Sequence, residues 1–264
     1  MMGRPGRKEL PLATLLGVND LPDPAREALE RARDKKLSYA VRLVRAPDGR
    51  TVAILGEAHM KLAEAAEIGR AVVAAFELRG VETFQRKQVF LGRTLGVLIS
   101  GPRLLLRLAS FGAIKGSTIT EAKQLPSGYT VELERTKHVP FGLHVTSLYM
   151  TAFFIVAFLG LLLPLIAPVS PALAALITMA MLAFQMHMIL LVPAIALRRF
   201  SWSWMIHPLV GILTLRDELM AAGTAQMLAD HPREKAAVVV MGRAHVQGYA
   251  RLLVEKYGFS SLPV

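Results

Sequence analysis

The sequence predicts an α/β domain that is interrupted by a two-helix transmembrane hairpin. Three observations lead to this fold class. The 264-residue chain is 53 % hydrophobic, yet it carries 31 Lys and Arg against 20 Asp and Glu, which indicates a soluble domain joined to a membrane part. From His138 to Leu197 there is no Asp, Glu, Lys or Arg. Finally, a strand, a Gly-x-x-His turn and a helix follow one another once on each side of this stretch.

The uncharged stretch has room for two membrane crossings. A transmembrane helix needs about 20 apolar residues to cross a hydrocarbon core of roughly 30 Å. We expect one helix near Thr146–Ala167 and a second near Pro171–Leu197. Pro168 and Ser170 supply the break between them, and Pro193 should kink the second helix near its end.

The charges that flank the hairpin predict its orientation. Arg135 and Lys137 precede it, Arg198 and Arg199 follow it, and the linking turn is uncharged. Because such residues stay on the cytoplasmic side, we expect a multi-pass integral membrane protein with its soluble domain and both termini in the cytoplasm. The amino-terminal residues lack a signal-peptide pattern, and the absence of cysteine suits a reducing compartment.

The chain is thereby divided into three parts. Residues 1–144 form the first part of the α/β domain, residues 145–198 the hairpin, and residues 199–264 an interfacial helix and the second part of the domain. Segment 202–215 is apolar enough to enter the membrane, but His207 and Pro208 favour an interfacial or re-entrant helix. A full crossing there would place the two halves of the domain on opposite sides.

The net charge of +11 is more consistent with a lipid surface than with nucleic acid. The basic residues are scattered and no nucleic-acid-binding motif accompanies them, so attraction to the anionic headgroups of the lipid bilayer is the better interpretation. In segment 100–111, Ser100 could cap a helix and Pro102 suits its first turn, while Arg103 and Arg107 share one face. A membrane-surface helix and an ordinary core-facing helix both fit this pattern.

The first Gly-x-x-His motif follows a predicted β-hairpin. Strands at Leu37–Arg45 and Thr51–Leu55 flank a sequence rich in turn formers. The motif itself, GEAH at Gly56–His59, comes directly after the second strand and precedes residues of helical composition. A second apolar run, Ala71–Phe76, then ends at Glu77, which we expect at the carboxyl end of a strand.

The second motif repeats this arrangement after the hairpin. Leu215–Asp230 reads as an amphipathic helix, Ala236–Met241 as a buried strand, and GRAH at Gly242–His245 leads into another helix. Because ligands in open α/β sheets gather at the carboxyl ends of strands, we expect the two motif histidines and Glu77 to meet there.

Two imidazoles and a carboxylate suit a divalent metal ion such as zinc, manganese or cobalt. His59, His245 and Glu77 are therefore the predicted ligands. A single Gly-x-x-His is more often a capping or packed histidine, and Glu77 could instead pair with Arg79. The occurrence of the motif at like positions on two strands favours the metal site.

An ordered set of motifs resembles the TraB/PrgY family, which is related to the Tiki metalloproteases. The set is GEAH, AFELR, LRDELM and MGRAH followed by GYARLLVEKYGF, and the resemblance covers most of residues 38–86 and 212–260. It implies that His59 and His245 are the paired histidines, Glu77 the strand-end glutamate and Arg216 the arginine of an arginine-acid motif. The membrane helices here interrupt the domain, whereas many relatives carry them at the carboxyl-terminal end or lack them.

The resemblance and the residues together predict a membrane-embedded, metal-dependent hydrolase, most simply a peptidase. The metal would lower the pKa of bound water and polarise a carbonyl, with Glu77 as ligand or base. Arg216 could stabilise the oxyanion, positioned by Asp217 or Glu218. Glu57, where many relatives have a small hydroxyl residue, could add charge to the site.

Two alternatives stay open. The first is a membrane regulator without catalysis that binds or sequesters a peptide or signalling molecule. The second is transport, which rests on His187 inside the second membrane helix. Two helices per chain cannot enclose a pathway without forming a homo-oligomer, so transport is the weaker reading.

Overall fold

The computed structural model describes residues 21–58, 63–83, 88–110 and 117–262, without the side chains of residues 102–108. The chain forms two compact units. The first comprises residues 1–83, 110–133 and 220–264, and the second comprises residues 84–109 and 134–219. Each is described by itself.

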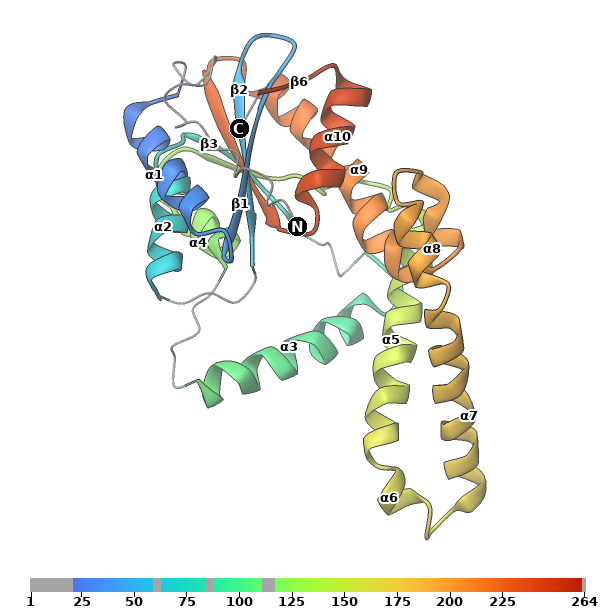
Figure 1. Ribbon diagram of the computed structural model, residues 1–264. Coiled ribbons are helices and arrows are strands. Elements are labelled where there is room, and N and C mark those ends of the chain that lie inside the picture. Colours follow the sequence, from blue (N-terminus) through green and yellow to red (C-terminus); the bar gives the residue numbers. More distant parts are fainter. Residues whose placement is uncertain (1–20, 59–62, 84–87, 111–116, 263–264) are drawn as a thin grey trace, which may run out of the picture. The chain divides into compact units, whose positions relative to one another are not determined.

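The first unit is built on a six-stranded mixed sheet with the order β4-β3-β5-β2-β1-β6 (Figure 1). Strands β4, β3, β5 and β2 run parallel, and β1 runs antiparallel to both of its neighbours. The strand bounds are β1 Tyr39–Arg45, β2 Thr51–Glu57, β3 Leu78–Val81, β4 Tyr129–Glu132, β5 Ala236–Gly242 and β6 Ser260–Ser261. The predicted β-hairpin is confirmed, because β1 and β2 pair from Arg45 and Thr51 outward.

Helices cover both faces of this sheet (Figure 1). One face carries α1 Asp23–Asp34, α2 Ala63–Ala74 and α4 Thr118–Gln124. The other carries α10 Val246–Tyr257 and the second half of α9 Gly211–Asp230. Successive residues of β2 alternate between the two cores: Ala53 and Leu55 pack on the first face, Val52 and Ile54 on the second. This three-layer arrangement confirms the predicted α/β class.

Strands β2 and β5 are direct neighbours although the apolar hairpin separates them in the sequence. They pair in parallel, with Thr51 opposite Ala236 and Glu57 opposite Gly242. The sheet is therefore made by both parts of the chain, and the hairpin is inserted into one domain.

The predicted strand at Ala71–Phe76 is wrong. These residues form the end of α2 and the turn after it, and β3 begins at Leu78. A helix forms here instead of a strand because Ala65, Ile68 and Val72 lie at helical spacing and are buried together on the sheet. Glu77 consequently precedes β3 instead of ending a strand.

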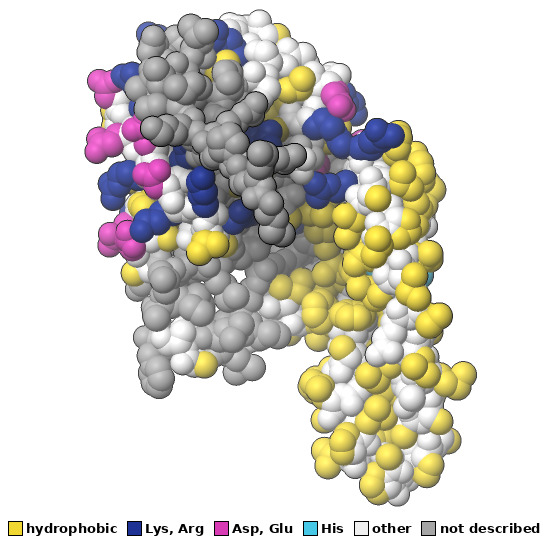
Figure 2. Space-filling model, in the orientation of Figure 1, with side chains coloured by type: hydrophobic (Ala, Val, Ile, Leu, Met, Phe, Trp, Pro, Cys, Tyr) yellow, Lys and Arg dark blue, Asp and Glu magenta, His cyan; other side chains and the backbone are white. Residues whose placement is uncertain are grey.

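The second unit contains two helices that are long and apolar enough to cross a membrane, Phe141–Leu161 and Pro171–Ala196, with mean hydropathies of 1.7 and 2.0. Their surface is largely apolar (Figure 2). The structure divides this hairpin into α5 Phe141–Leu161, α6 Leu163–Ile166, α7 Pro171–Met188 and α8 Leu191–Ala196.

Prolines set the breaks in the hairpin. Pro164 and Pro193 lack the N–H that would continue each helix, and the chain leaves the α-helix at Leu162 and after Met188. The helix predicted to kink at Pro193 is interrupted between Met188 and Leu191, and the first helix ends at Leu161, earlier than the predicted Ala167. Ser170 caps α7 by accepting a hydrogen bond from the Leu173 N–H at 3.4 Å.

Segment 202–215 does not form the single interfacial helix that the sequence predicts. It consists of two short 3₁₀ helices, η3 Ser201–Met205 and η4 Pro208–Val210, followed by the first turns of α9. The Thr146 hydroxyl of α5 donates to the Pro208 carbonyl at 2.8 Å, which holds η4 against α5.

The predicted helix start at Ser100 is also wrong. Helix α3 spans Gly92–Ala109, so Ser100 and Pro102 lie in its interior. The side chains of Arg103 and Arg107 lie outside the described residues.

Candidate functional site

Three ionisable side chains are buried at the carboxyl edge of the parallel strands. Glu57 ends β2, Glu82 follows β3 and His245 follows β5, and their exposed fractions are 1 %, 8 % and 4 %. Strand pairing brings the three strand ends together, because β5 lies between β3 and β2. This edge is where open α/β sheets place their ligands.

Glu82 and His245 lie side by side at the centre of this edge. Glu82 Oε1 is 3.7 Å from His245 Nε2. The other carboxylate oxygen of Glu82 accepts a hydrogen bond from the N–H of Gly242, the first residue of the second motif. The Glu82 N–H in turn donates to the Val240 carbonyl at 2.9 Å, which extends the β3–β5 ladder to the site. Glu82 is therefore fixed by backbone on both sides.

The glycine of the first motif permits the close approach of the second. A Cβ atom on Gly56 would overlap a methyl group of Val246 and lie 3.2 Å from Arg243 Cα. The Arg243 N–H donates to the Glu57 backbone carbonyl at 3.0 Å. The absence of a side chain at Gly56 thus lets the turn after β5 lie directly against the end of β2.

Glu57 has structural partners on the helical layer. Its carboxylate accepts hydrogen bonds from the Ser117 hydroxyl and from the Thr118 N–H, the latter at 2.9 Å. Ser117 also caps α4 by accepting from the Ile119 N–H at 3.2 Å. The predicted acid of the GEAH motif therefore anchors the start of α4 to the end of β2.

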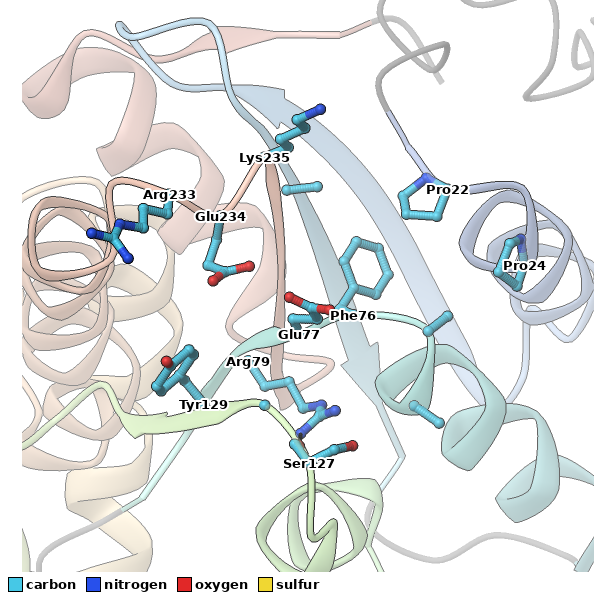
Figure 3. Close-up of a pocket in the computed structure, with 14 residues that line it drawn as sticks. Pro22, Pro24, Phe76, Glu77, Arg79, Ser127, Tyr129, Arg233, Glu234 and Lys235 are labelled. Atoms are coloured by element: carbon cyan, nitrogen blue, oxygen red, sulfur yellow. Dashed lines mark hydrogen bonds between the residues drawn. The ribbon is translucent and has the colours of Figure 1, made fainter.

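Glu77 lies at the opposite edge of the sheet, so its predicted meeting with His245 is wrong. It precedes β3 and lines a surface hollow of about 990 Å³ beside the amino end of β5, together with Glu234 and Lys235 (Figure 3). The physical reason is the direction of β3, which runs parallel to β5 and carries its carboxyl end to Glu82.

Arg79, the salt-bridge partner considered for Glu77, is held mainly by backbone. Its Nε donates to the Val73 carbonyl and its Nη1 to the Ser127 carbonyl, both at 2.6 Å. Burial lowers the pKa of Arg79, and the charge of Glu77 acts in the opposite direction. These contacts tie the end of α2 and the turn before β4 to β3.

Arg216 forms an ion pair with a residue that the sequence analysis did not single out. Its Nε and Nη2 donate to the two carboxylate oxygens of Glu134, at 2.5 and 2.8 Å. The side chains are 9 % and 2 % exposed. Asp217, the acid predicted to position Arg216, is also buried. Arg216, Asp217 and Glu134 all belong to the second unit.

His59 lies outside the described residues, which at this point end at Ala58. Among the residues that are described, no three His, Cys, Asp or Glu side chains come together as a metal-binding group. Glu82 and His245 supply two suitable donors. Two ligands about 2.1 Å from a tetrahedral ion lie about 3.4 Å apart, close to their separation of 3.7 Å. The donor chemistry and the spacing of Glu82 and His245 therefore fit a divalent cation whose remaining ligands come from other groups.

Glu82 was missed because the apolar run Ala71–Phe76 resembles a buried strand and points to Glu77. A weak signal was present in the sequence: Glu82 is the first acid after the short run Leu78–Val81. Comparisons with family models, curated proteins and solved structures gave no match for this chain.

Proposed function

We propose that this protein is a membrane-anchored, metal-dependent hydrolase that cleaves peptides, with its site at the carboxyl edge of β3, β5 and β2. The observation that carries the proposal is the buried pair of Glu82 and His245 at the ends of two adjacent parallel strands. The TraB/PrgY resemblance of the motifs around the site supports the same activity.

The proposed ligands are His245, Glu82 and His59. A bound divalent ion would activate water and polarise a substrate carbonyl without a nucleophilic side chain. Glu82 is preorganised for this role, because the Gly242 N–H fixes one of its oxygens and leaves the other directed towards His245. Glu57 keeps the neighbouring strand end in register with α4.

The hairpin would anchor this domain with an even number of crossings. Strands β2 and β5 pair directly, so they lie on the same side of the bilayer, and the chain between them must return to the side it left. Two spans satisfy this condition, and segment 202–215 then does not cross. Arg198 and Arg199 after the second span support a cytoplasmic domain.

Metal analysis of the full-length, detergent-purified protein tests the site. We expect a divalent ion in stoichiometric amount, which is lost in the His245→Ala and Glu82→Ala variants. Glu77→Ala is the matched control, since it removes an equal carboxylate from the opposite edge of the sheet and should leave metal content unchanged. The proposal is contradicted if the wild-type protein contains no metal. It is also contradicted if the wild type and the three variants all fold and contain the same amount of metal.

A second candidate is a membrane protein that binds a peptide or signalling molecule without cleaving it. It is favoured by the structural partners of two predicted catalytic residues, because Glu57 bonds Ser117 and Thr118 while Arg216 bonds Glu134. Mass spectrometry of a peptide library incubated with the Mn²⁺- or Co²⁺-loaded protein separates the two. Cleavage products indicate the hydrolase, whereas depletion of intact peptides indicates the binder.

A further inference from the structure

Two histidines and a tyrosine form a hydrogen-bonded cluster in the second unit, whereas Glu57, Glu82 and His245 belong to the first. The Tyr149 hydroxyl of α5 lies 2.9 Å from Nδ1 of His187 on α7. The same hydroxyl lies 3.4 Å from Nε2 of His207, which stands between η3 and η4. The two imidazole rings stack with centroids 4.6 Å apart and planes 17° apart. His207 is completely buried.

The cluster joins segment 201–210 to both long helices of the hairpin. Tyr149 lies about 12 Å along α5 from Phe141, at 1.5 Å per residue. His207 reaches Tyr149, and Pro208 accepts a hydrogen bond from Thr146 on the same helix. Segment 201–210 therefore returns alongside the first turns of α5, where the cluster and the Thr146 hydroxyl are its polar attachment points.

The hydrogen bonds assign one direction to the network. The Leu209 N–H donates to Nδ1 of His207 at 3.3 Å, so neutral His207 carries its proton on Nε2 and can donate it to the Tyr149 oxygen. The Tyr149 O–H can then donate to Nδ1 of His187. This direction requires that Nδ1 of His207 carries no proton, so that it can accept from the Leu209 N–H.

Protonation of His207 breaks this arrangement. A proton on Nδ1 of His207 would face the Leu209 N–H and remove the cap of η4. A charge on His187 would also raise the cost of charging His207, which is stacked on it and completely buried.

A shared metal ion is a poor explanation for the pair. The lone pair of an imidazole nitrogen lies in the plane of its ring, and two stacked, nearly parallel planes do not converge on one ion. The geometry of the two rings is therefore better suited to responding to a proton than to holding a metal ion.

The neighbouring elements contribute little charge that could compensate protonation. Between His138 and Leu215 the only Lys, Arg, Asp or Glu residues are Arg198 and Arg199, and Arg199 lies over the Phe200 ring at 4.7 Å. His144 of α5 accepts from the Phe90 N–H through Nδ1.

Two further helices of this unit carry charged residues. Helix α3, which packs on α5, carries Arg93, Arg103 and Arg107, and the last two side chains are outside the described part. On α9, Arg216 is paired with Glu134 beside the acids Asp217 and Glu218. Burial lowers the pKa of His207, and the charge of His187 lowers it further.

We propose that Tyr149, His187 and His207 form a pH-sensitive latch. The cluster with neutral His207 holds segment 201–210 against the hairpin, and protonation of His207 releases the segment. The sign follows from the preference of the closed state for neutral His207. The latch is fully closed when the pH is above the ordinary histidine pKa of 6.5, and it opens as the pH falls below that value. Residue Gly211, the first of α9, follows the latched segment directly.

The chain supplies its own reporter of release. Its two tryptophans, Trp202 and Trp204, both lie in η3 within the latched segment. We expect the intrinsic fluorescence of the full-length protein in lipid nanodiscs, with EDTA present, to show a reversible red shift as the pH is lowered from about 8 to about 5. Far-UV circular dichroism should show that the helices persist across this range.

Three variants decide the proposal. His207→Asn keeps an acceptor for the Leu209 N–H but cannot titrate, so the fluorescence transition should be lost. Tyr149→Phe removes the bridging hydroxyl and should move the midpoint to higher pH. His144→Gln, on the same helix but outside the cluster, should behave as wild type. A wild-type protein without a transition, a transition that survives in His207→Asn, or an unchanged midpoint in Tyr149→Phe overturns the latch.

Discussion

Arg216 and Glu134 are joined by two hydrogen bonds of 2.5 and 2.8 Å in a pair that is almost fully buried. Removing one partner of such a pair leaves the other charge buried without its counter-ion. We expect Arg216→Ala to lower the free energy of unfolding by about 3–5 kcal/mol. Chemical denaturation in detergent, followed by circular dichroism, measures this change.

The exposed pair of Lys123 and Glu132 provides the control for this measurement. Their atoms approach to 2.6 Å, but both side chains are more than a third exposed to solvent. Because water screens such a pair, Lys123→Ala should cost no more than about 1 kcal/mol. An Arg216→Ala variant that is as stable as Lys123→Ala, but inactive, would instead assign Arg216 to catalysis.

Gly56→Ala should disturb the junction between the two Gly-x-x-His turns. The added methyl group would overlap Val246 and crowd Arg243, so one of the two strand ends must move. We expect a loss of about 1–3 kcal/mol in the free energy of unfolding, together with weaker metal binding. Both are measured on the purified variant by denaturation and metal titration.

Gly101→Ala is the matched glycine control. Gly101 lies inside α3 and nothing lies within 4 Å of its would-be Cβ, so alanine should be neutral or stabilise by up to about 1 kcal/mol. Equal effects at the two glycines would show that the contact of Gly56 with the turn after β5 has no energetic weight.

The turn of the β-hairpin predicts a small pH dependence of stability. Hydrogen bonds from the Arg50 side chain lower the pKa of Asp48 below its ordinary value of 3.8, and burial, the next largest cause, acts in the opposite direction. The charged form is thus favoured in the folded state. The contribution of charged Asp48 to the free energy of unfolding is complete above pH 3.8. It is lost as the pH falls through the lower pKa that Asp48 has in the folded state.

Asp48→Asn isolates this contribution. Asp48 is half exposed, so the variant should lose no more than about 1 kcal/mol near neutral pH. The difference from wild type should shrink as the pH is lowered below 3.8, measured by urea denaturation near neutral pH and at acidic pH. A difference that is constant with pH would assign the effect to packing.

Labelling of single cysteines tests the membrane topology, because the chain has no cysteine of its own. We expect positions 48 and 235, at the β-hairpin turn and before β5, to react from the same face of the membrane. Position 169, in the turn between α6 and α7 with an exposed fraction of 85 %, should react only from the opposite face. Labels at 48 and 235 from opposite faces would exclude the two-crossing arrangement.

The acid beside His245 is Glu82, although the sequence predicted Glu77 at this position. The run Ala71–Phe76 is apolar throughout, and such a run fits a buried strand as well as the end of a buried helix. The strand that forms is only Leu78–Val81, too short to carry a periodicity of its own. The acid beside His245 is therefore Glu82, while Glu77 precedes the same strand at its opposite end.

The sequence by itself determined the features that depend on neighbouring residues. These are the apolar hairpin, the β1–β2 turn, and the order of strand, Gly-x-x-His turn and helix, since length, apolar pattern and turn residues are local properties. Only the tertiary structure decided which distant side chains meet. Glu134 binds Arg216 across 82 positions, and Gly242 binds Glu82 across 160. The second pair meets because β5 lies beside β3 in the sheet and runs parallel to it. No local pattern encodes such pairings, as they arise when the sheet and its helices pack around shared cores.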